Sequence, residues 1–245
     1  MTRPRTAIVT GAASGIGAAT VTELVAQGYR VAGVDRDGPG VRKIMAAAGE
    51  QHVAIEADIT DERAIAGVFA DAVKALGGLD ALVTSAGVAE MTPFMELDAA
   101  TFRRVYEHNV VGTFLCIREA AKHMAPGARI CTVASVAGLR GGGLSGTAAY
   151  AASKGAVLAL TKNAARALAD KGIAVNTIAP GATMTPMIAH VFANAAHRQR
   201  VESMSVMNRV GEAAEIARAI AFLVSAGASY VDGATLVADG GLCMY

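Results

Sequence analysis

The chain has 245 residues, with 22 Lys and Arg against 21 Asp and Glu, which gives a formal net charge of +1. This balance excludes the basic excess that proteins binding nucleic acids or anionic membranes use to neutralise phosphate groups. A composition of 53% hydrophobic and 18% charged residues excludes a disordered chain and can bury a large core. Aromatic residues make up only 4% of the chain, and the 27 glycines favour close packing of helices on a sheet.

Cysteine usage and hydropathy indicate a reducing compartment. The three cysteines, Cys116, Cys131 and Cys243, are an odd number without C-x-x-C spacing, so we expect neither a disulfide framework nor a metal site. The apolar run that begins at Ala7 is broken at Thr10, before the core of a signal peptide could form. No apolar run reaches the roughly 18 residues that a membrane span needs. We predict a cytoplasmic protein that binds neither membranes nor nucleic acids.

Short β-branched runs alternate with longer Ala-rich stretches along the whole chain. Strands that alternate with helices pair in parallel through right-handed crossovers, and apolar runs such as Ala81–Val83 are typical of strands covered on both faces. We therefore predict an α/β fold, a Rossmann-like doubly wound parallel sheet of about seven strands with helices on both faces, in one domain over residues 1–245. The runs typical of strands are Thr6–Thr10, Arg30–Val34, His52–Ala57, Ala81–Thr84, Arg129–Ala134, Ala174–Ala179 and Ala234–Val237. The stretches typical of helices are Gly15–Gln27, Val41–Ala48, Glu62–Leu76, Ala99–His123, Ala149–Asp170 and Ala213–Val224.

Two stretches interrupt this alternation, and both follow the carboxyl end of a predicted strand. Gly138–Gly146 is rich in glycine and predicts a flexible loop, and Thr183–Arg209 is a long insertion that contains several methionines. Open α/β sheets bind their ligands at this edge, so we predict that residues 183–209 form a mobile lid over a substrate. A packed or oligomeric pair of helices is the alternative for the same segment.

A glycine-rich turn joins the first predicted strand to the first predicted helix. Thr10–Gly17 reads TGAASGIG, and Asp35 ends the second predicted strand 18 residues after Gly17. Glycines at such a turn let the backbone approach a pyrophosphate, and the carboxylate can accept hydrogen bonds from ribose hydroxyls. The combination predicts a dinucleotide cofactor. Asp35 favours NAD because it would repel the 2′-phosphate of NADP, whereas the neighbouring Arg36 could offset that repulsion.

Tyr150 and Lys154 lie one turn apart in a predicted helix, so their side chains share a face. A phenol has a reference pKa of about 10, and lowering this pKa to about 7 requires roughly 4 kcal/mol. A cation about 4 Å away at an effective dielectric of about 20 supplies about that amount. Ser135 ends the fifth predicted strand, where its hydroxyl can donate to a carbonyl or alkoxide oxygen. The alternatives are a tyrosine packed under a lysine stem and an ordinary serine at a strand end.

These motifs, in this order, resemble the short-chain dehydrogenase/reductase family, in its compact single-domain branch, over essentially the whole chain. The matching positions are TGAASGIG at Thr10–Gly17, Asp35, Asp58, SAG at Ser85–Gly87, HNVVG at His108–Gly112, Ser135, YAASK at Tyr150–Lys154, PGATMT at Pro180–Thr185 and Asp239–Gly241. The resemblance implies a catalytic tetrad of Asn109, Ser135, Tyr150 and Lys154, in which Asn109 holds the water of a proton relay to Lys154. It implies a cofactor site formed by Gly11, Ala13, Ser14, Gly15, Ile16, Gly17, Asp35, Arg36, Asp58, Ile59, Ser85, Ala86, Gly87, Tyr150, Lys154, Pro180, Gly181, Thr183 and Thr185.

The chain departs from the family pattern in two places. Ser85 stands where the family usually has asparagine, and Tyr150 follows Ser135 by 15 positions, about two more than is common in the family. The glycine-rich loop can absorb this insertion, so the tetrad can form while the wall of the substrate pocket differs.

We predict an NAD-dependent oxidoreductase that interconverts a secondary alcohol and a ketone by hydride transfer, with Tyr150 as the acid/base. One alternative is a 3-oxoacyl-(acyl carrier protein) or acyl-CoA reductase that uses NADPH. Asp35 disfavours this alternative, because such reductases usually take NADPH. These reductases also tend to have a basic residue for docking the acidic carrier protein at the segment that corresponds to Met124–Gly127, which has none, although Lys171 remains. A second alternative is a catalytically silent NAD-binding protein, which the presence of both Tyr150 and Lys154 disfavours.

Two further expectations concern partners. The resemblance implies that Ala99–His123 and Ala149–Asp170 pair across a two-fold axis, which makes a homodimer or homotetramer. The substrate is a small-molecule alcohol or ketone whose identity the sequence leaves open. The basic residues in the candidate pocket and lid that could bind an acidic substrate are Arg140, His190, His197, Arg198 and Arg200.

Overall fold

A parallel sheet of seven strands forms the centre of the protein, in a computed structural model that describes residues 3–142, 147–189, 192 and 194–244. The strand order is β3-β2-β1-β4-β5-β6-β9, and every neighbouring pair is parallel. This confirms the predicted doubly wound sheet. The strands are β1 (Thr6–Thr10), β2 (Arg30–Asp35), β3 (Val53–Glu56), β4 (Leu79–Thr84), β5 (Met124–Val133), β6 (Ala174–Pro180) and β9 (Thr235–Ala238).

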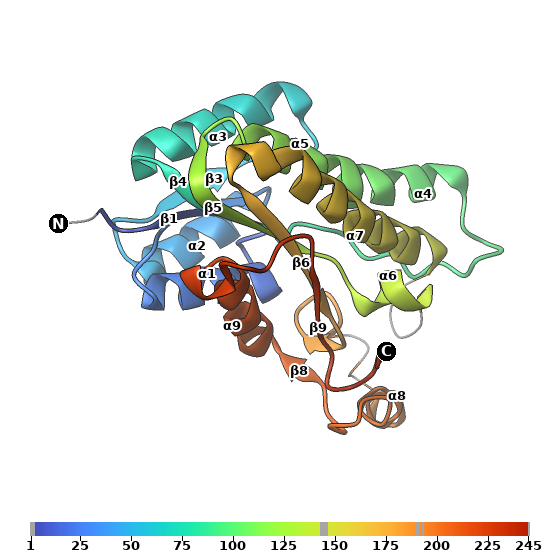
Figure 1. The fold of residues 1–245 in the computed structure, drawn as a ribbon. Helices are drawn as coiled ribbons and strands as arrows, with labels where there is room; N and C mark the ends of the chain where they lie inside the picture. The colour runs from blue at the N-terminus through green and yellow to red at the C-terminus, as the bar shows by residue number, and fades with distance from the viewer. Residues whose placement is uncertain (1–2, 143–146, 190–191, 193, 245) are drawn as a thin grey trace.

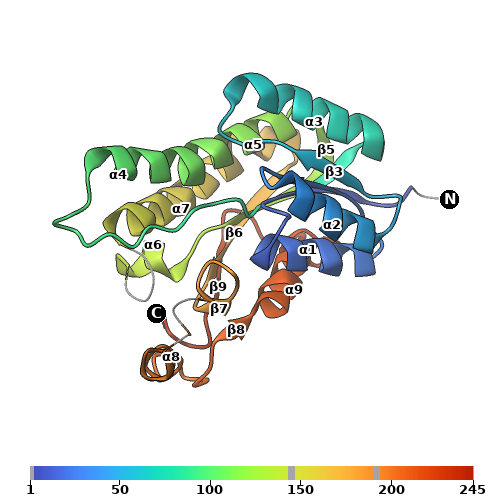
Figure 2. The same cartoon turned by 180° about the vertical axis from the view of Figure 1, so that it is seen from behind.

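Helices cover both faces of this sheet, as Figure 1 and the view from behind in Figure 2 show. On one face Ile8, Leu82 and Ile130 pack against α3, α5 and α7, and on the other face residues such as Val9 and Val83 pack against α1, α2 and α9. Because alternate residues of a strand point to opposite faces, both sets are apolar and the strands read as continuous apolar runs. The helices are α1 (Gly15–Ala26), α2 (Gly38–Ala48), α3 (Glu62–Leu76), α4 (Ala99–Tyr106), α5 (Gly112–Ala120), α6 (Val136–Arg140), α7 (Ala148–Leu168), α8 (Ala195–Glu202) and α9 (Ala213–Leu223).

Helix α2 begins three residues before the predicted Val41. Asp37 caps its N-terminus, because the Asp37 Oδ1 accepts a hydrogen bond of 3.0 Å from the backbone N–H of Gly40. Pro39 lies in the first turn, where its missing N–H costs nothing. A cap and a proline therefore define this start more strongly than the apolar pattern does.

The predicted helix Ala99–His123 is not one uniform α-helix, which corrects the sequence-based expectation. It consists of α4, a π-helical turn at Glu107–Val111, and α5. The turn is centred on Asn109, whose buried side chain bonds to a neighbouring loop instead of facing solvent. One extra residue in a helical turn re-aims a side chain in this way, and such turns are frequent at functional sites.

The two stretches that interrupt the alternation are partly ordered. Helix α6 (Val136–Arg140) includes the first three residues of the predicted flexible loop, Gly138–Arg140, whereas Gly143–Gly146 of that loop lies outside the described residues, as does His190. The predicted lid contains β7 (Thr183–Met184) and α8, and β7 pairs in parallel with β8 (Gly211–Glu212). The backbone N–H of Met207 donates to the carbonyl of Gly240 over 3.0 Å, so the end of the lid packs on the C-terminal segment.

Within the part of the chain that the structure describes, we find no helix that is both long and apolar enough to cross a membrane. Cys116, Cys131 and Cys243 are free thiols, and the first two are buried.

Candidate active site

A cleft of about 390 Å³ opens at the carboxyl edge of the sheet, where the strand order reverses between β1 and β4. Open α/β sheets form their ligand sites at this switch point, because the loops from the two neighbouring strands diverge there. Every residue predicted to bind the cofactor lines the cleft except Gly17. Of the predicted tetrad, Ser135, Tyr150 and Lys154 line it and Asn109 does not.

The glycine-rich turn shapes one wall of this cleft. Gly11 has φ +70°, and a Cβ at that position would lie 2.6 Å from the backbone N of Ala86 in the loop after β4. A Cβ on Gly17 would lie 2.0 Å from the carbonyl oxygen of Gly11. Gly17 therefore lies behind the turn and lets the helix pack on it, so its contribution to the predicted cofactor site is to shape the turn.

The first residues of α1, Gly15 and Ile16, line the cleft together with Ser14. Ser14 precedes this helix with extended backbone and forms no side-chain cap hydrogen bond, and no acidic residue lies in the first turn. Uncapped N–H groups at a helix N-terminus attract an anion such as a pyrophosphate. The turn therefore fits the phosphates of a dinucleotide.

Asp35 is held in place at the end of β2. Its Oδ2 accepts a hydrogen bond of 3.0 Å from the N–H of Ala13, and its Oδ1 accepts one of 2.9 Å from the N–H of Asp37. Each carboxylate oxygen can accept a further hydrogen bond, and Asp35 lines the cleft. The adjoining Arg36 lines the same wall and is exposed.

Asp58 follows β3 on the same side of the cleft. Burial raises the pKa of its carboxyl, but hydrogen bonds from the N–H and hydroxyl of Thr60 and the positive charges of His108 and Arg36 outweigh this and lower the pKa. The Thr60 bonds measure 2.9 and 2.8 Å. Asp58 therefore stays ionised, and it presents a second acceptor at this end of the cleft.

Ser135, Tyr150 and Lys154 meet at the other end of the cleft. Ser135 caps α6, where its Oγ accepts a hydrogen bond of 3.1 Å from the N–H of Ala137. Tyr150 and Lys154 lie on one face of α7, with the lysine Nζ 5.8 Å from the centroid of the tyrosine ring. The same Nζ donates to the carbonyl of Val133 at 2.8 Å, and Lys154 is only 6% exposed.

Burial dominates the pKa values of these groups. Burial raises the pKa of the Tyr150 phenol above its ordinary value of 10.0, and a hydrogen bond from Ser135 offsets only part of this increase. Burial lowers the pKa of Lys154 from 10.5 to about 8. The spacing of Tyr150 and Lys154 predicts a lowered phenol pKa, but desolvation is the larger effect and raises it, so the phenol is protonated at neutral pH.

A close contact between two helices brings Ser135 to Tyr150. A Cβ on Gly138 would lie 2.6 Å from the backbone N of Gly155, so α6 rests directly on α7. Sequence reasoning missed these two glycines as positioning residues. Their only signal in the sequence is their position, because Gly138 follows Ser135 by three residues and Gly155 follows Tyr150 by five.

Asn109 contacts the loop after β4 and helix α7. Its Oδ1 accepts from the N–H of Val88 at 2.8 Å, and its Nδ2 donates to the Val88 carbonyl at 3.0 Å and to Ser153 Oγ at 2.9 Å. Gly87 lies between this amide and Lys154, since a Cβ there would lie 3.0 Å from Asn109 Oδ1 and 3.5 Å from Lys154 Nζ. The Asn109 side chain thus links its own helical turn, the loop after β4 and helix α7 close to Lys154. Sequence reasoning missed Ser153, whose spacing of three residues from Tyr150 was its only signal.

The basic residues proposed for an acidic substrate differ in whether they line the cleft. Arg140 lines the cleft. Arg198 pairs with Glu202 within α8 over 2.8 Å. His197 and Arg200 also lie on α8, outside the lining of the cleft.

Comparisons with known proteins agree with this geometry. Residues 11–243 match a family model described as enoyl-(acyl carrier protein) reductase. The chain belongs to the short-chain dehydrogenase/reductase family. It is 40% identical to cis-4-hydroxycyclohexanecarboxylate dehydrogenase of Sinomonas cyclohexanicum, covering 97% of this chain and 96% of that protein. It is 37% identical to 2,5-dichloro-2,5-cyclohexadiene-1,4-diol dehydrogenase of Sphingobium indicum, with the same coverage of both chains.

Solved structures show the same relationship. A short-chain dehydrogenase/reductase from Brucella melitensis, described as a glucose/ribitol dehydrogenase, superimposes with a TM-score of 0.93. The two chains are 33% identical, and the match covers 99% of this chain and 98% of the other. The short-chain dehydrogenase/reductase resemblance from the sequence is therefore confirmed, and the protein is an oxidoreductase of this family.

Proposed function

We propose that the protein is an NAD-dependent dehydrogenase that interconverts a secondary alcohol and a ketone. The observation that carries this proposal is the convergence of Ser135, Tyr150 and Lys154 in the cleft whose other end is formed by the glycine-rich turn and Asp35. The relatives described above, named for the oxidation of ring alcohols, support the same reaction class.

The residues of the cleft have distinct roles in this reaction. When bound, NAD supplies the carbon that accepts or returns the hydride. The Ser135 hydroxyl donates a hydrogen bond to the substrate oxygen and holds it beside Tyr150. The Tyr150 Oη takes the hydroxyl proton as the alcohol becomes a ketone, and returns it in the reverse direction.

Lys154 favours the ionised form of Tyr150 and also holds a hydroxyl of the cofactor. Its own pKa of about 8 keeps the ammonium charged at neutral pH. Because burial raises the pKa of Tyr150, ionisation of the phenol needs positive charge beyond that of Lys154, which an oxidised nicotinamide would add when bound. Base catalysis by Tyr150 is therefore coupled to cofactor binding. We infer that Asn109 holds the water of a proton relay to Lys154, because only Gly87 separates the Asn109 amide from the Lys154 Nζ.

Replacement of Tyr150 by phenylalanine tests this proposal. Wild-type protein, Tyr150→Phe and the control Tyr230→Phe are assayed by nicotinamide absorbance on secondary alcohols, polyols, hydroxy acids and acyl thioesters with NAD and NADP. We expect Tyr150→Phe to lower kcat by about 100-fold or more while the Kd for NAD changes by less than about threefold. Tyr230 is fully exposed and its loss should change neither quantity. Turnover of Tyr150→Phe near that of wild type would refute the assignment of the acid/base.

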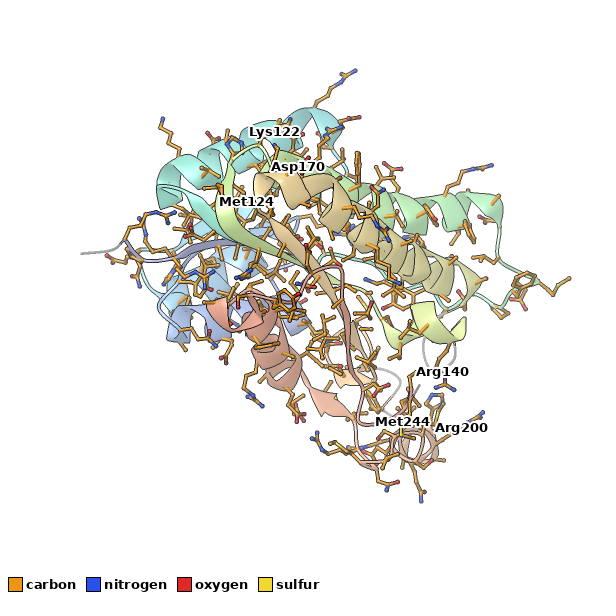
Figure 3. All side chains as sticks on the ribbon, in the orientation of Figure 1. Lys122, Met124, Arg140, Asp170, Arg200 and Met244 are labelled. Carbon is orange, nitrogen blue, oxygen red and sulfur yellow. The ribbon has the colours of Figure 1, made fainter. Side chains whose placement is uncertain are left out.

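Reduction of a 3-oxoacyl thioester with NADPH is the second candidate, because the family model carries an acyl carrier protein description. Met124–Gly127, the segment where carrier-dependent reductases tend to have a basic residue, begins β5 at the amino edge of the sheet. Figure 3 shows Met124 with Lys122 at the end of the molecule opposite to Arg140. Lys171 near this segment donates to the carbonyl of Ala121 at 3.1 Å. A higher kcat/KM for an acyl thioester with NADPH than for every alcohol with NAD would favour this candidate.

A further inference from the structure

Arg140 is the last residue of α6, the short helix that Ser135 caps. Both residues line the cleft, together with Tyr150. Five helical residues rise by roughly 7.5 Å, so the backbone of Arg140 is placed at a fixed short distance from the serine that holds the substrate oxygen. Figure 3 shows the Arg140 side chain at the end of the molecule that also holds Met244 and Arg200.

Arg140 is exposed at the cleft. The acidic residue near it, Asp239, accepts hydrogen bonds from the N–H groups of Gly241 and Cys243. The acidic residues that line the cleft are Asp35, Asp37 and Asp58, which follow β2 and β3 at the cofactor end. The apolar residues of the cleft lining include Met187 of the lid and Leu242. A guanidinium at the end of the cleft away from the three carboxylates attracts an anion with little competition from like charges on that anion's side.

Arg140 makes no ion pair with any carboxylate of the described residues, whereas six other arginines of that part of the chain do. The charge of Arg140 reaches the C-terminal segment. Burial and Asp239 raise the pKa of the Cys243 thiol, whereas the positive charge of Arg140 lowers it. The guanidinium is thus available beside the substrate end of the cleft.

We infer that Arg140 binds a carboxylate of the substrate, which makes the substrate a hydroxy acid whose carboxylate lies several bonds from the carbinol carbon. The inference rests on the proposed function and names its substrate class. A guanidinium offers two parallel N–H donors that match the two oxygens of a carboxylate. Met187 and Leu242 contact the apolar body of the molecule between the two polar ends.

The position of Arg140 at the end of a helix has another physical reason, since a cation there stabilises the helix dipole. Arg166 provides the matched control, because it lies in the last turn of α7 and outside the cleft lining. Loss of Arg166 removes the same kind of dipole contact without touching the proposed carboxylate site.

The test compares cis-4-hydroxycyclohexanecarboxylate with its carboxamide, which has the same shape and no charge. Wild type, Arg140→Gln, Arg140→Lys and Arg166→Gln are assayed with NAD. We expect wild type to prefer the carboxylate at least about tenfold in kcat/KM, and Arg140→Gln to lose about 10- to 100-fold on the carboxylate, mainly through KM. We expect the kcat/KM of Arg140→Gln for the carboxamide to differ from that of wild type by less than about twofold. On the carboxylate, the kcat/KM of Arg140→Lys should lie between those of wild type and Arg140→Gln, and that of Arg166→Gln should match wild type.

Calorimetric titration with cyclohexanecarboxylate and cyclohexanecarboxamide in the presence of NAD gives a second readout that needs no turnover. We expect the carboxylate to bind wild type more tightly by about tenfold or more and to lose this advantage in Arg140→Gln. Equal binding of both compounds to wild type, or an equal loss of both in Arg140→Gln, overturns the inference. Failure of wild type to oxidise any alcohol in the panel sinks the proposed function instead, and the titration still decides whether Arg140 binds a carboxylate.

Discussion

Lys154 carries its positive charge where water hardly reaches, since the residue is 6% exposed and its Nζ donates to the Val133 carbonyl. Its pKa of about 8 lies below the ordinary 10.5. Below pH 8 both the folded and the unfolded chain hold the proton, and the buried charge destabilises the fold by an amount on the order of 3 kcal/mol. As pH rises from 8 to 10.5, the folded protein releases this proton first, so the contribution of Lys154 to the free energy of unfolding rises.

Lys154→Met should therefore remove activity and this pH dependence together. We expect the difference in unfolding free energy, wild type minus Lys154→Met, to rise by about 2 kcal/mol between pH 7 and pH 10. Urea unfolding of both proteins at several pH values measures it. Taking the difference cancels the opposite trend from Cys116 and Cys131, whose thiol pKa values burial raises to about 12. A difference that is constant with pH would show that Lys154 keeps its ordinary pKa in the folded protein.

Asp35 should decide the choice of cofactor. A carboxylate about 4 Å from a 2′-phosphate at an effective dielectric near 20 costs roughly 4 kcal/mol per unit charge, and solvent reduces this. We expect kcat/KM with NAD to exceed that with NADP by about tenfold or more, and Asp35→Ala to shift the ratio toward NADP. Asp71→Ala, on the exposed face of α3, is the control. Equal efficiency of wild type with both cofactors would mean that Arg36 determines the preference.

At the scale of secondary structure elements, the contact of α6 with α7 positions the catalytic groups. A methyl group on Gly138 would collide with the backbone of Gly155, whereas Gly67 in the middle of α3 has open space around it. We expect Gly138→Ala to destabilise the protein by about 1–3 kcal/mol and to lower kcat, because α6 must move and take Ser135 with it. Gly67→Ala should stabilise it by about 0.5–1 kcal/mol without changing kcat.

Thermal or urea unfolding and steady-state kinetics of the two variants separate these effects. Both substitutions replace glycine by alanine within a helix, so helix propensity alone favours both. If Gly138→Ala were as stable and as active as Gly67→Ala, the contact between α6 and α7 would have no role in placing Ser135.

At the scale of the whole molecule, a shallow groove lies between α4 and α7. It is lined by Phe102, Tyr106, Val111 and Ala152 together with the charged Arg103 and Glu107, and the rings of Phe102 and Tyr106 stack 6.1 Å apart. We propose that the face around this groove pairs with a second copy across a two-fold axis. Light scattering at micromolar concentration should give a dimer or tetramer, and Phe102→Asp should reduce the mass while the circular dichroism spectrum stays unchanged. A monomeric mass for wild type would refute this proposal.

Features that depend on neighbouring residues could be predicted from the sequence. The alternation of strands and helices, the glycine-rich turn, Asp35 at the end of β2 and the pair of Tyr150 and Lys154 on one helix face all follow from local patterns. Their physical basis is short range, since side-chain periodicity and backbone freedom act over a few residues. The resemblance to the family then added positions such as Asp58 that no local pattern singles out.

Other features depend on packing between distant segments, and only the tertiary structure decided them. Asn109 bonds to Val88 and Ser153, and Lys154 bonds to Val133, each across more than 20 positions. The π-helical turn at Asn109 follows from such bonds, because a local apolar pattern continues through it. The pKa values of Tyr150 and Lys154 were decided in the same way, since burial depends on which elements cover a group and outweighs the effect of the neighbour one turn away.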